Sequence, residues 1–381
     1  MPFFRSARGD AYDADRPTPP VRARPSQSYP EATEGLARPL LGHLDPAFID
    51  LMDETCERLR AVWGTRNART LPLSATGSAG MEAAFVNTVH PGDAVVVAVN
   101  GLFGQRMCEV AARCGAEVVP VEHPWGAPVD PERVLAAHPD PAIVAAVHAE
   151  TSTGVWSDIA ELGDAVHSAT DALLFVDAVT SIGGIELRAD DWGIDVGYAG
   201  TQKCLGVAPG LAPFTISDRA FERRVERPPS WYLDLGLLGG YVGEAGTKTS
   251  GGTRTYHHTA PVAMVSSLHD GLGRILEEGL DNVWARHAEA GETLQNGLEG
   301  LGLELFAQKG YRLPNLTTVK VPEGVDSAAV RRKLLERYDI EIGAGVGDYA
   351  ASVWRIGLMG PNARPDAVAL ILSALGETLG R

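Results

Sequence analysis

Three features of the chain combine residue types and positions that suit chemistry, and the first is a lysine. Lys203 lies in the stretch GTQKCLG and is one of five lysines among 33 lysines and arginines. A lysine amine can lose its proton and attack a carbonyl, which an arginine does not do. Lys203 is therefore a candidate nucleophile, and the alternative is that this cation is a lysine by chance.

The second feature is an aspartate at the end of an apolar run. Asp177 follows LLFV, so its carboxylate lies at the rim of a buried strand, where desolvation is costly unless a cation or a polarised donor is near. Lys203 also follows a strand-like run, VGYAG, and open α/β sheets bind ligands at the carboxyl ends of their strands. We expect both side chains to face one crevice, and a structural or capping role for Asp177 is the alternative.

The third feature is the turn SATGSAG at residues 74–80, directly before the helical pattern MEAAF. The N–H groups of a helix start, with the hydroxyls of Thr76 and Ser78, suit a phosphate, although such a turn can also be only a helix cap. A phosphate cradle, a buried carboxylate and a reactive lysine together meet the requirements of pyridoxal phosphate. The lysine binds this cofactor covalently, the aspartate keeps the pyridine nitrogen protonated, and the ring withdraws electrons from the substrate.

Two more side chains suit supporting roles in such a site. Phe103, in NGLFG, can stack on the cofactor ring or belong to the core. Arg355, in VWRIG, can bind a substrate carboxylate through two hydrogen bonds or pair on the surface. A non-catalytic binding protein of the same fold would be expected to lack Lys203 or Asp177, and both are present.

The elements that must position these residues alternate between strand and helix. Runs that are apolar at nearly every position predict strands at 94–99, 117–121, 142–147 and 172–176. Helical patterns lie between the runs, for example in MEAAFVNTV, GQRMCEVAARCG and DIAELGDAVHSA. Strands that are apolar on both faces predict an α/β fold with a mostly parallel sheet layered between helices.

Composition and pattern divide the chain into three parts. Residues 1–35 are rich in Pro, Arg, Ser and Asp and are expected to form an arm that lies on the body or on a partner. Residues 36–275 are expected to form a large cofactor-binding domain, which includes a long Gly-rich passage at 231–258. A long helix over about 261–298 is expected to lead into a smaller α+β domain, residues 276–381.

The bulk composition excludes several classes of protein. No window approaches the ~18 apolar residues of a membrane span, and the start of the chain has no apolar core of a secretory signal, so we expect a cytoplasmic protein that does not enter membranes. The formal charge of −16 argues against nucleic-acid binding. The four cysteines show no paired CxxC spacing, and no metal site is expected.

With these residues in place, the sequence resembles the class V aminotransferases of fold type I, specifically the alanine/serine:glyoxylate (or pyruvate) group. The resemblance covers most of the chain through the segments LLGHLDPAF, EAAFVNTVHPGD, NGLFGQR, HAETSTGV, FVDAVTSIGG, GTQKCLG, TYHHT and RIGLMG. It implies a seven-stranded sheet of the large domain, a small C-terminal domain, pyridoxal phosphate as cofactor, and a homodimer with shared active sites.

Site residues follow from the same resemblance. It implies that Lys203 is the Schiff-base lysine, Asp177 the partner of the pyridine nitrogen, and Arg355 the arginine that binds the substrate carboxylate. It also implies that Tyr256 and Thr259 reach the cofactor phosphate of the other subunit. Further cofactor contacts are implied at Thr76, Gly77, Ser78, Phe103, Thr151 and Gln202.

The implied activity is transamination between a small amino acid, alanine or serine, and a small 2-oxo acid, glyoxylate or pyruvate. The arm reads RPSQSYP, with Arg24 and Gln27 where relatives usually have Gly and Asn beside the substrate. This departure keeps open a transaminase for another amine, such as ureidoglycine or a pathway-specific substrate. A lyase of the cysteine desulfurase type is a further alternative, but it needs a mobile cysteine, and residues 231–258 contain none.

Overall fold

A seven-stranded sheet forms the centre of the protein. A computed structural model describes residues 21–22, 27–242 and 254–381, and β10 is the one strand of this sheet that runs antiparallel to its neighbours. The prediction of a mostly parallel sheet is therefore confirmed. In spatial order the strands are β2 (Arg69–Leu73), β10 (Ala212–Ile216), β9 (Val196–Tyr198), β8 (Leu173–Asp177), β5 (Ile143–Val147), β3 (Ala94–Val99) and β4 (Glu117–Glu122).

The predicted strands agree with the structure to within one residue at each end. β3 reads AVVVAV, and all of its residues after the first are buried, as expected for a strand that is covered on both faces. β5 and β8 are buried along their whole length. Because β10 is antiparallel to both β2 and β9, β2 runs in the same direction as β9 and β8. The carboxyl ends of β2, β8 and β9 therefore meet at one edge of the sheet.

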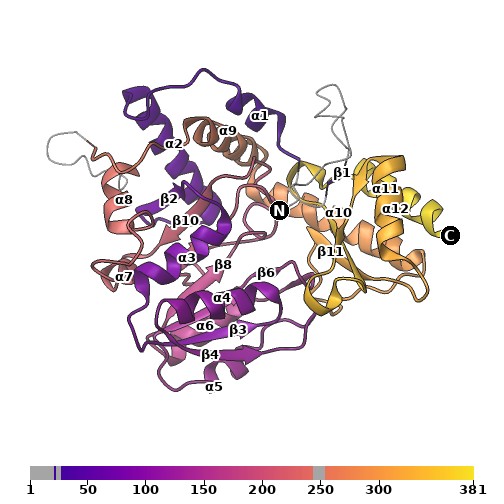
Figure 1. Cartoon of the computed structure of the whole chain (residues 1–381), viewed down its shortest axis with the longest axis horizontal. Coiled ribbons are helices and arrows are strands. Elements are labelled where there is room, and N and C mark those ends of the chain that lie inside the picture. The colour runs from indigo at the N-terminus through magenta and orange to yellow at the C-terminus, as the bar shows by residue number, and fades with distance from the viewer. Residues whose placement is uncertain (1–20, 23–26, 243–253) are drawn as a thin grey trace, which may run out of the picture.

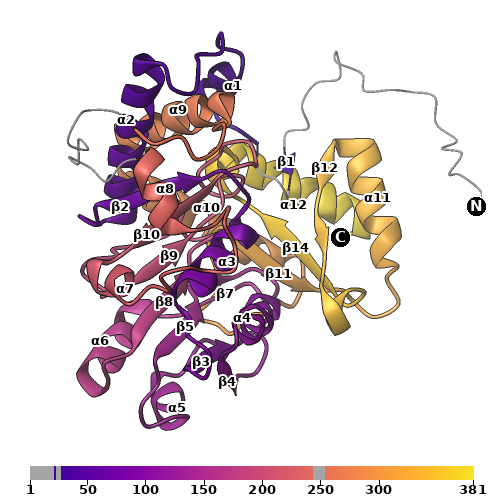
Figure 2. The same ribbon diagram turned by 60° about the vertical axis from the view of Figure 1, so that its left-hand side comes forward.

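Helices cover both faces of this sheet. Figure 2 shows α3 and α4 on one side of the strands and α6 on the other. Connections between parallel strands are right-handed, and the chain moves one way along the sheet from β3 to β4 and the other way from β5 to β8, which places α4 and α6 on opposite faces. The helices of this part are α2 (Pro46–Trp63), α3 (Gly77–Thr88), α4 (Leu102–Arg113), α5 (Pro131–Ala136), α6 (Ile159–Ala169), α7 (Asp218–Glu222) and α8 (Leu235–Val242).

The helical stretch that was predicted over 261–298 as one long helix is two helices, α9 (Val262–Glu278) and α10 (Leu280–Gly300). Gly279 separates them with a φ of 85°, a conformation that glycine adopts without strain and that interrupts a helix. Helix α10 then leads into a second hydrophobic cluster, formed by residues from Ala290 onward.

This second cluster lies between a small sheet and three helices, seen on the right of Figure 1. The strand order of the small sheet is β11-β14-β13, and all of its pairs are antiparallel. The division at residue 276 stays a prediction. The elements here are β11 (Leu316–Lys320), α11 (Ser327–Tyr338), β12 (Ile340–Glu341), β13 (Gly343–Ala344), β14 (Val353–Gly357), α12 (Pro365–Leu379) and the 3₁₀ turns Gly347–Tyr349 and Gly360–Asn362.

Two segments that were predicted without regular structure contain helices. Helix α1 (Pro30–Leu36) begins inside the predicted arm and packs against α9, next to α2 (Figure 1). The arm also supplies the two-residue strand β1 (Val21–Arg22), which pairs with β12. Helix α8 lies inside the Gly-rich passage 231–258. Among the described residues, no helix is both long enough and apolar enough to cross a membrane.

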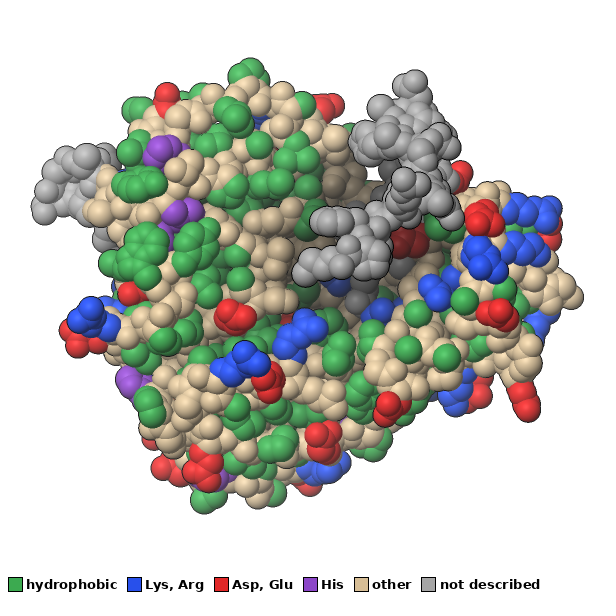
Figure 3. Space-filling view, in the orientation of Figure 1, with side chains coloured by type: hydrophobic (Ala, Val, Ile, Leu, Met, Phe, Trp, Pro, Cys, Tyr) green, Lys and Arg blue, Asp and Glu red, His purple; other side chains and the backbone are tan. Residues whose placement is uncertain are grey.

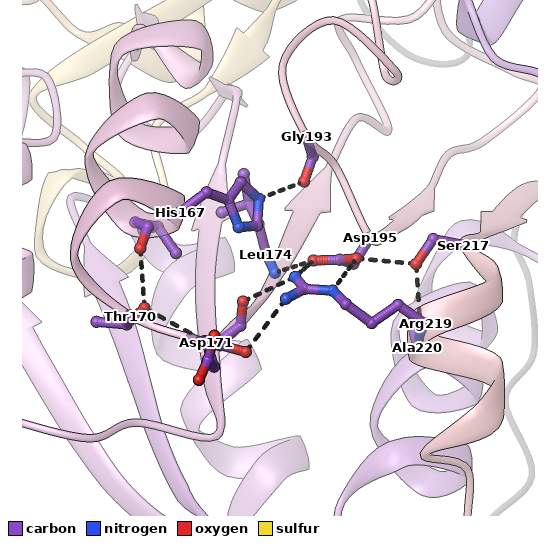
Figure 4. Close-up of polar contacts among 11 residues, drawn as sticks. His167, Thr170, Asp171, Leu174, Gly193, Asp195, Ser217, Arg219 and Ala220 are labelled. Atoms are coloured by element: carbon purple, nitrogen blue, oxygen red, sulfur yellow. Dashed lines mark hydrogen bonds and ion pairs between the residues drawn. The ribbon is translucent and has the colours of Figure 1, made fainter.

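The buried carboxylate of Asp195 connects β8 to the elements around it (Figure 4). This contact lies at the end of the sheet opposite to the carboxyl ends of β2, β8 and β9. Asp195 accepts hydrogen bonds from the Leu174 N–H at 2.9 Å and from the Ser217 hydroxyl at 2.8 Å. Arg219 forms an ion pair with Asp195 and donates to the carbonyl oxygen of Ala172 at 3.0 Å. These bonds join β8 to α7, and so hold the strand whose other end carries Asp177.

Candidate active site

A cavity of about 410 Å³ opens at the edge of the sheet where β2, β8 and β9 end. Its walls come from the start of α3, the start of α4, and the loops after β8 and β9. The structure thus brings seven of the predicted site residues together around one space. They are Thr76, Gly77, Ser78, Phe103, Asp177, Gln202 and Lys203.

The first turn of α3 forms one end of this cavity. Thr76 is the N-cap residue, and within the described chain its side chain makes no capping hydrogen bond to the helix. Gly77 packs tightly against the loops that follow β8 and β9. A Cβ at this position would lie 2.9 Å from Val179 Cγ2 and 3.1 Å from the carbonyl oxygen of Ala199. The N–H groups of a helix start attract anions, so this turn suits a phosphate.

Asp177 is the last residue of β8 and is almost completely buried. Its Oδ1 accepts a hydrogen bond from the Val179 N–H at 2.9 Å. Burial raises the pKa of Asp177 to about 7; the nearby Glu150 carboxylate adds to this, and the Val179 bond and the Lys203 charge act against it. A protonated pyridine nitrogen would give this carboxylate the cation that favours its charged form.

Lys203 lies in the loop after β9, and only 6% of its surface is exposed. The loop is closed by backbone bonds from Gly206 N to the Lys203 carbonyl at 3.0 Å and from Val207 N to the Thr201 carbonyl at 3.1 Å. The Thr201 hydroxyl also donates to the carbonyl oxygen of Ala208 at 2.7 Å. Lys203 is therefore held in a well-braced turn in the wall of the cavity.

Arg355 lies on β14, the central strand of the small sheet, and is buried. Its Nε donates to the carbonyl oxygen of Ala344 at 2.6 Å, and its Nη1 is buried without a partner among the described residues. Burial lowers the pKa of Arg355, and the charge of Glu150 opposes this. Because Glu150 lies three residues after β5 of the large sheet and bonds to the Phe103 N–H beside the cavity, Arg355 faces the part of the molecule that holds the cavity. A guanidinium with an unmet donor suits a carboxylate ligand.

The other predicted residues do not line the cavity of their own chain. Thr151 is buried in the turn after β6 (Ala149–Glu150). Tyr256 and Thr259 are exposed, with their side-chain oxygens 3.5 Å apart. Gln27 is half-buried close to the Lys203 loop, since Tyr29 N, two residues on, donates to the Gly206 carbonyl at 2.8 Å. Arg24 lies outside the described residues.

Sequence reasoning missed Glu150, a fully buried carboxylate beside the cavity. Its Oε1 accepts from the N–H and the hydroxyl of Ser152, at 2.9 and 2.6 Å, and its Oε2 accepts from the Phe103 N–H at 2.9 Å. Glu150 thereby fixes the start of α4, which carries Phe103. Its burial raises its pKa. The signal was the one that identified Asp177, a carboxylate soon after an apolar strand.

Arg106 was missed as well, although it lies in the wall of the cavity. Its guanidinium carbon is 5.1 Å from the centre of the Phe103 ring, and its Nη1 is 3.5 Å from Ser78 Oγ. A cation next to the start of α3 adds to the attraction for a phosphate. The available signal was the spacing in NGLFGQR, because residues three apart share one face of a helix.

Together these residues fit pyridoxal phosphate. The α3 turn and Arg106 suit its phosphate, Asp177 suits its pyridine nitrogen, and Lys203 suits its aldehyde.

The sequence matches the family Aminotransferase class-V over residues 18–360. It is 38% identical over 362 residues to an alanine–glyoxylate aminotransferase of Drosophila melanogaster, covering 93% of this chain and 90% of that protein. It is 36% identical over 380 residues to an (S)-ureidoglycine–glyoxylate transaminase of Bacillus subtilis (strain 168), covering 94% and 89%. The crystal structure of an alanine–glyoxylate aminotransferase from Nostoc sp. matches with a TM-score of 0.90 and 42% identity over the whole of both chains. The resemblance inferred from the sequence is thus confirmed, and the chain belongs to the class V aminotransferases, pyridoxal-phosphate-dependent enzymes of fold type I.

Proposed function

We propose that the protein transfers an amino group from a small amino acid, alanine or serine, to a small 2-oxo acid, glyoxylate or pyruvate. The observation that carries this proposal is the buried, unmet Nη1 donor of Arg355, whose guanidinium interacts with Glu150 beside the cavity of about 410 Å³. The cofactor must occupy much of that volume, so the remaining space suits a small carboxylate. Glyoxylate appears in the names of relatives that match nearly the whole chain.

A second candidate donor is ureidoglycine. The Bacillus subtilis relative is named for this substrate at an identity close to that of the alanine-named relative. Gln27 is a candidate partner for the additional amide groups of such a donor, because its segment packs beside the Lys203 loop. The two candidates share the same chemistry at the reacting carbon and differ only in the group that the donor carries.

Each residue has a distinct part in the proposed reaction. Bound pyridoxal phosphate supplies an aldehyde that takes up the amino group and a cationic ring that withdraws electrons from the substrate α-carbon. The Lys203 amine would hold the cofactor and would act as the general base that moves a proton from the substrate α-carbon. Asp177 would keep the ring nitrogen protonated, and Phe103, which lines the same cavity, would stack on the ring. Arg355 binds the substrate carboxylate and so fixes the α-carbon beside Lys203.

We expect a panel of amino acids, tested in single half-reactions by cofactor absorbance, to show fast conversion with alanine or serine and slow conversion with bulky donors. Fast conversion with ureidoglycine alone would favour the second candidate. Arg355→Lys keeps the charge but loses the paired hydrogen bonds, so amino-acid half-reactions should slow by ~10²-fold or more. Amines without a carboxylate should change little, and an equal loss for both classes of amine would contradict the role of Arg355.

We also propose that the protein is a homodimer. Large apolar side chains are exposed together over the α1–α2 connection, α8 and the segment around Tyr256, and Figure 3 shows hydrophobic side chains gathered on this side of the molecule. Contiguous exposed apolar surface of this kind is typical of protein interfaces. A second copy on this face would bring Tyr256 and Thr259 towards a neighbouring cavity. The exposed residues are Leu40, Leu41, Leu44, Trp231, Tyr232, Leu237 and Tyr256.

A mixed dimer tests whether the active sites are shared. One chain carries Lys203→Ala and the other carries Tyr256→Ala with Thr259→Ala, and each homodimer should be weak. If Tyr256 and Thr259 act across the interface, the mixed dimer has one site with every defect and one intact site. Co-expression should then restore up to about half of the wild-type rate. If both residues serve their own chain, both sites stay damaged and no activity returns.

A further inference from the structure

A second cavity, of about 550 Å³, lies apart from the active site and shares none of its lining residues. It lies between the start of α6, residues 185–192 and α10. Three indole rings line it, those of Trp156, Trp192 and Trp284, and we call it the tryptophan cavity. Its inner wall adjoins β8, because the His148 N–H donates to the Asp177 carbonyl oxygen at 3.1 Å.

The charges around the tryptophan cavity are negative. Asp158 and Glu186 line it, and no lysine or arginine is among the described residues of its wall. His148 also lines it, and burial lowers the pKa of His148 to about 3, so this ring is neutral at physiological pH. Two carboxylates beside three electron-rich indole rings attract a cation, and the surrounding protein, with a formal charge of −16, adds to that attraction.

An arginine of the chain already uses this combination at the rim of the cavity. The Arg188 guanidinium carbon lies 5.4 Å from the centre of the Trp284 ring. Its Nε is 2.6 Å from Glu186 Oε1, and 45% of its side chain is exposed. The Trp284 ring and the Glu186 carboxylate therefore bind a cation jointly in this structure, and that cation is a side chain that an incoming ligand can displace into water.

Two residues of the cavity wall also carry buried polar atoms without partners. Trp284 Nε1 and His148 Nδ1 are both buried, and neither has a hydrogen-bond partner within the described part of the chain. His148 is only 3% exposed, and its ring meets Trp192 edge to face at 5.4 Å. A buried polar atom is costly without a partner. Both atoms lie beneath the surface of the cavity, so the indole rings and the carboxylates form the wall that a ligand meets.

We propose that the tryptophan cavity binds a small organic ammonium ion of the quaternary ammonium class. The ammonium group packs against the indole rings and the Glu186 carboxylate, as the Arg188 guanidinium does at the rim. This site is independent of the transamination proposed above, and its ligand does not have to react.

Choline is a suitable probe, because its quaternary nitrogen cannot condense with an aldehyde and so cannot react with the cofactor. Its neutral isostere 3,3-dimethylbutan-1-ol has the same shape and hydroxyl without the charge. We expect calorimetric titration of the cofactor-loaded protein to show saturable choline binding that is at least about 10-fold tighter than that of the isostere. Equal affinities, or no saturable choline binding, would overturn the proposal.

Three variants localise the binding. Trp284→Leu and Glu186→Gln should each weaken choline binding by about 10-fold, whereas Arg188→Gln should strengthen it because the competing guanidinium is gone. Trp125→Leu is the matched control, since Trp125 stacks on Tyr349 at 5.3 Å outside the cavity and its loss should change nothing. If Trp284→Leu fails to fold, the other two variants still test the proposal, because Glu186→Gln should weaken choline binding and Arg188→Gln should strengthen it. Choline binding that ignores these two variants would place the ligand elsewhere and refute the assignment.

Discussion

Replacement of Lys203 by alanine is expected to lower the transamination rate by about 10⁴-fold or more, or at least ~5 kcal/mol of barrier. The variant loses both the covalent attachment of the cofactor and the base that moves the α-proton. Lys203→Arg should be almost as inactive, because a guanidinium keeps the charge but neither attacks an aldehyde nor accepts a proton at neutral pH. Steady-state rates with alanine and glyoxylate measure both effects.

A chemical label separates loss of chemistry from loss of structure. Borohydride reduction of the loaded protein should fix the cofactor to the peptide that contains Lys203, and mass spectrometry identifies that peptide. Lys320 is a matched control, because it pairs with Glu304 on the surface and Lys320→Ala should change neither the label nor the rate. A label on Lys248, which lies outside the described residues, would contradict the assignment of Lys203.

The placement of Lys203 and Asp177 at one cavity could be predicted from the sequence because their signals are local. Each follows an apolar run, and parallel strands place their carboxyl ends on the same edge of a sheet without further information. The start of α3 joined them for the same reason, since β2 runs parallel to β8 and β9. The strands themselves were equally visible, because a run such as AVVVAV is apolar on both faces.

Some of the features that were missed depend on contacts between distant parts of the chain. Glu150 bonds to the backbone of Phe103, 47 residues away, and nothing near Glu150 in the sequence shows that contact. Helix α1 lies in a polar, Pro-rich segment, and its stability comes from packing on α9 rather than from its own pattern. The break at Gly279 was missed because single glycines also occur inside helices, and Gly271 and Gly273 of α9 are examples.

Asp177→Asn is expected to lower the transamination rate by about 10³-fold, or ~4 kcal/mol of barrier, while the protein still folds and binds the cofactor. Asparagine has nearly the same shape and can still accept the Val179 N–H, but it cannot hold a proton on the pyridine nitrogen by its charge. The ring then withdraws electrons less strongly from the substrate. Single-turnover rates with alanine measure this step apart from cofactor binding, and a near-normal rate would make Asp177 a structural residue only.

The same substitution should have the opposite effect on the stability of the cofactor-free protein. Burial raises the pKa of Asp177 to about 7 from the 3.8 of an exposed carboxyl, so the folded state holds a proton that the unfolded chain releases. Wild-type stability should therefore fall as the pH rises from about 4 to about 7 and stay level above that range. The asparagine side chain of the variant does not titrate. Denaturant titrations should therefore show the free energy of unfolding of the variant rising relative to that of the wild type from about pH 4 to about pH 7, and the difference should stay constant above that range. A variant that is slow in turnover yet at least as stable above pH 7 would assign the loss to ring chemistry, whereas a variant destabilised at every pH would assign it to damage of the fold.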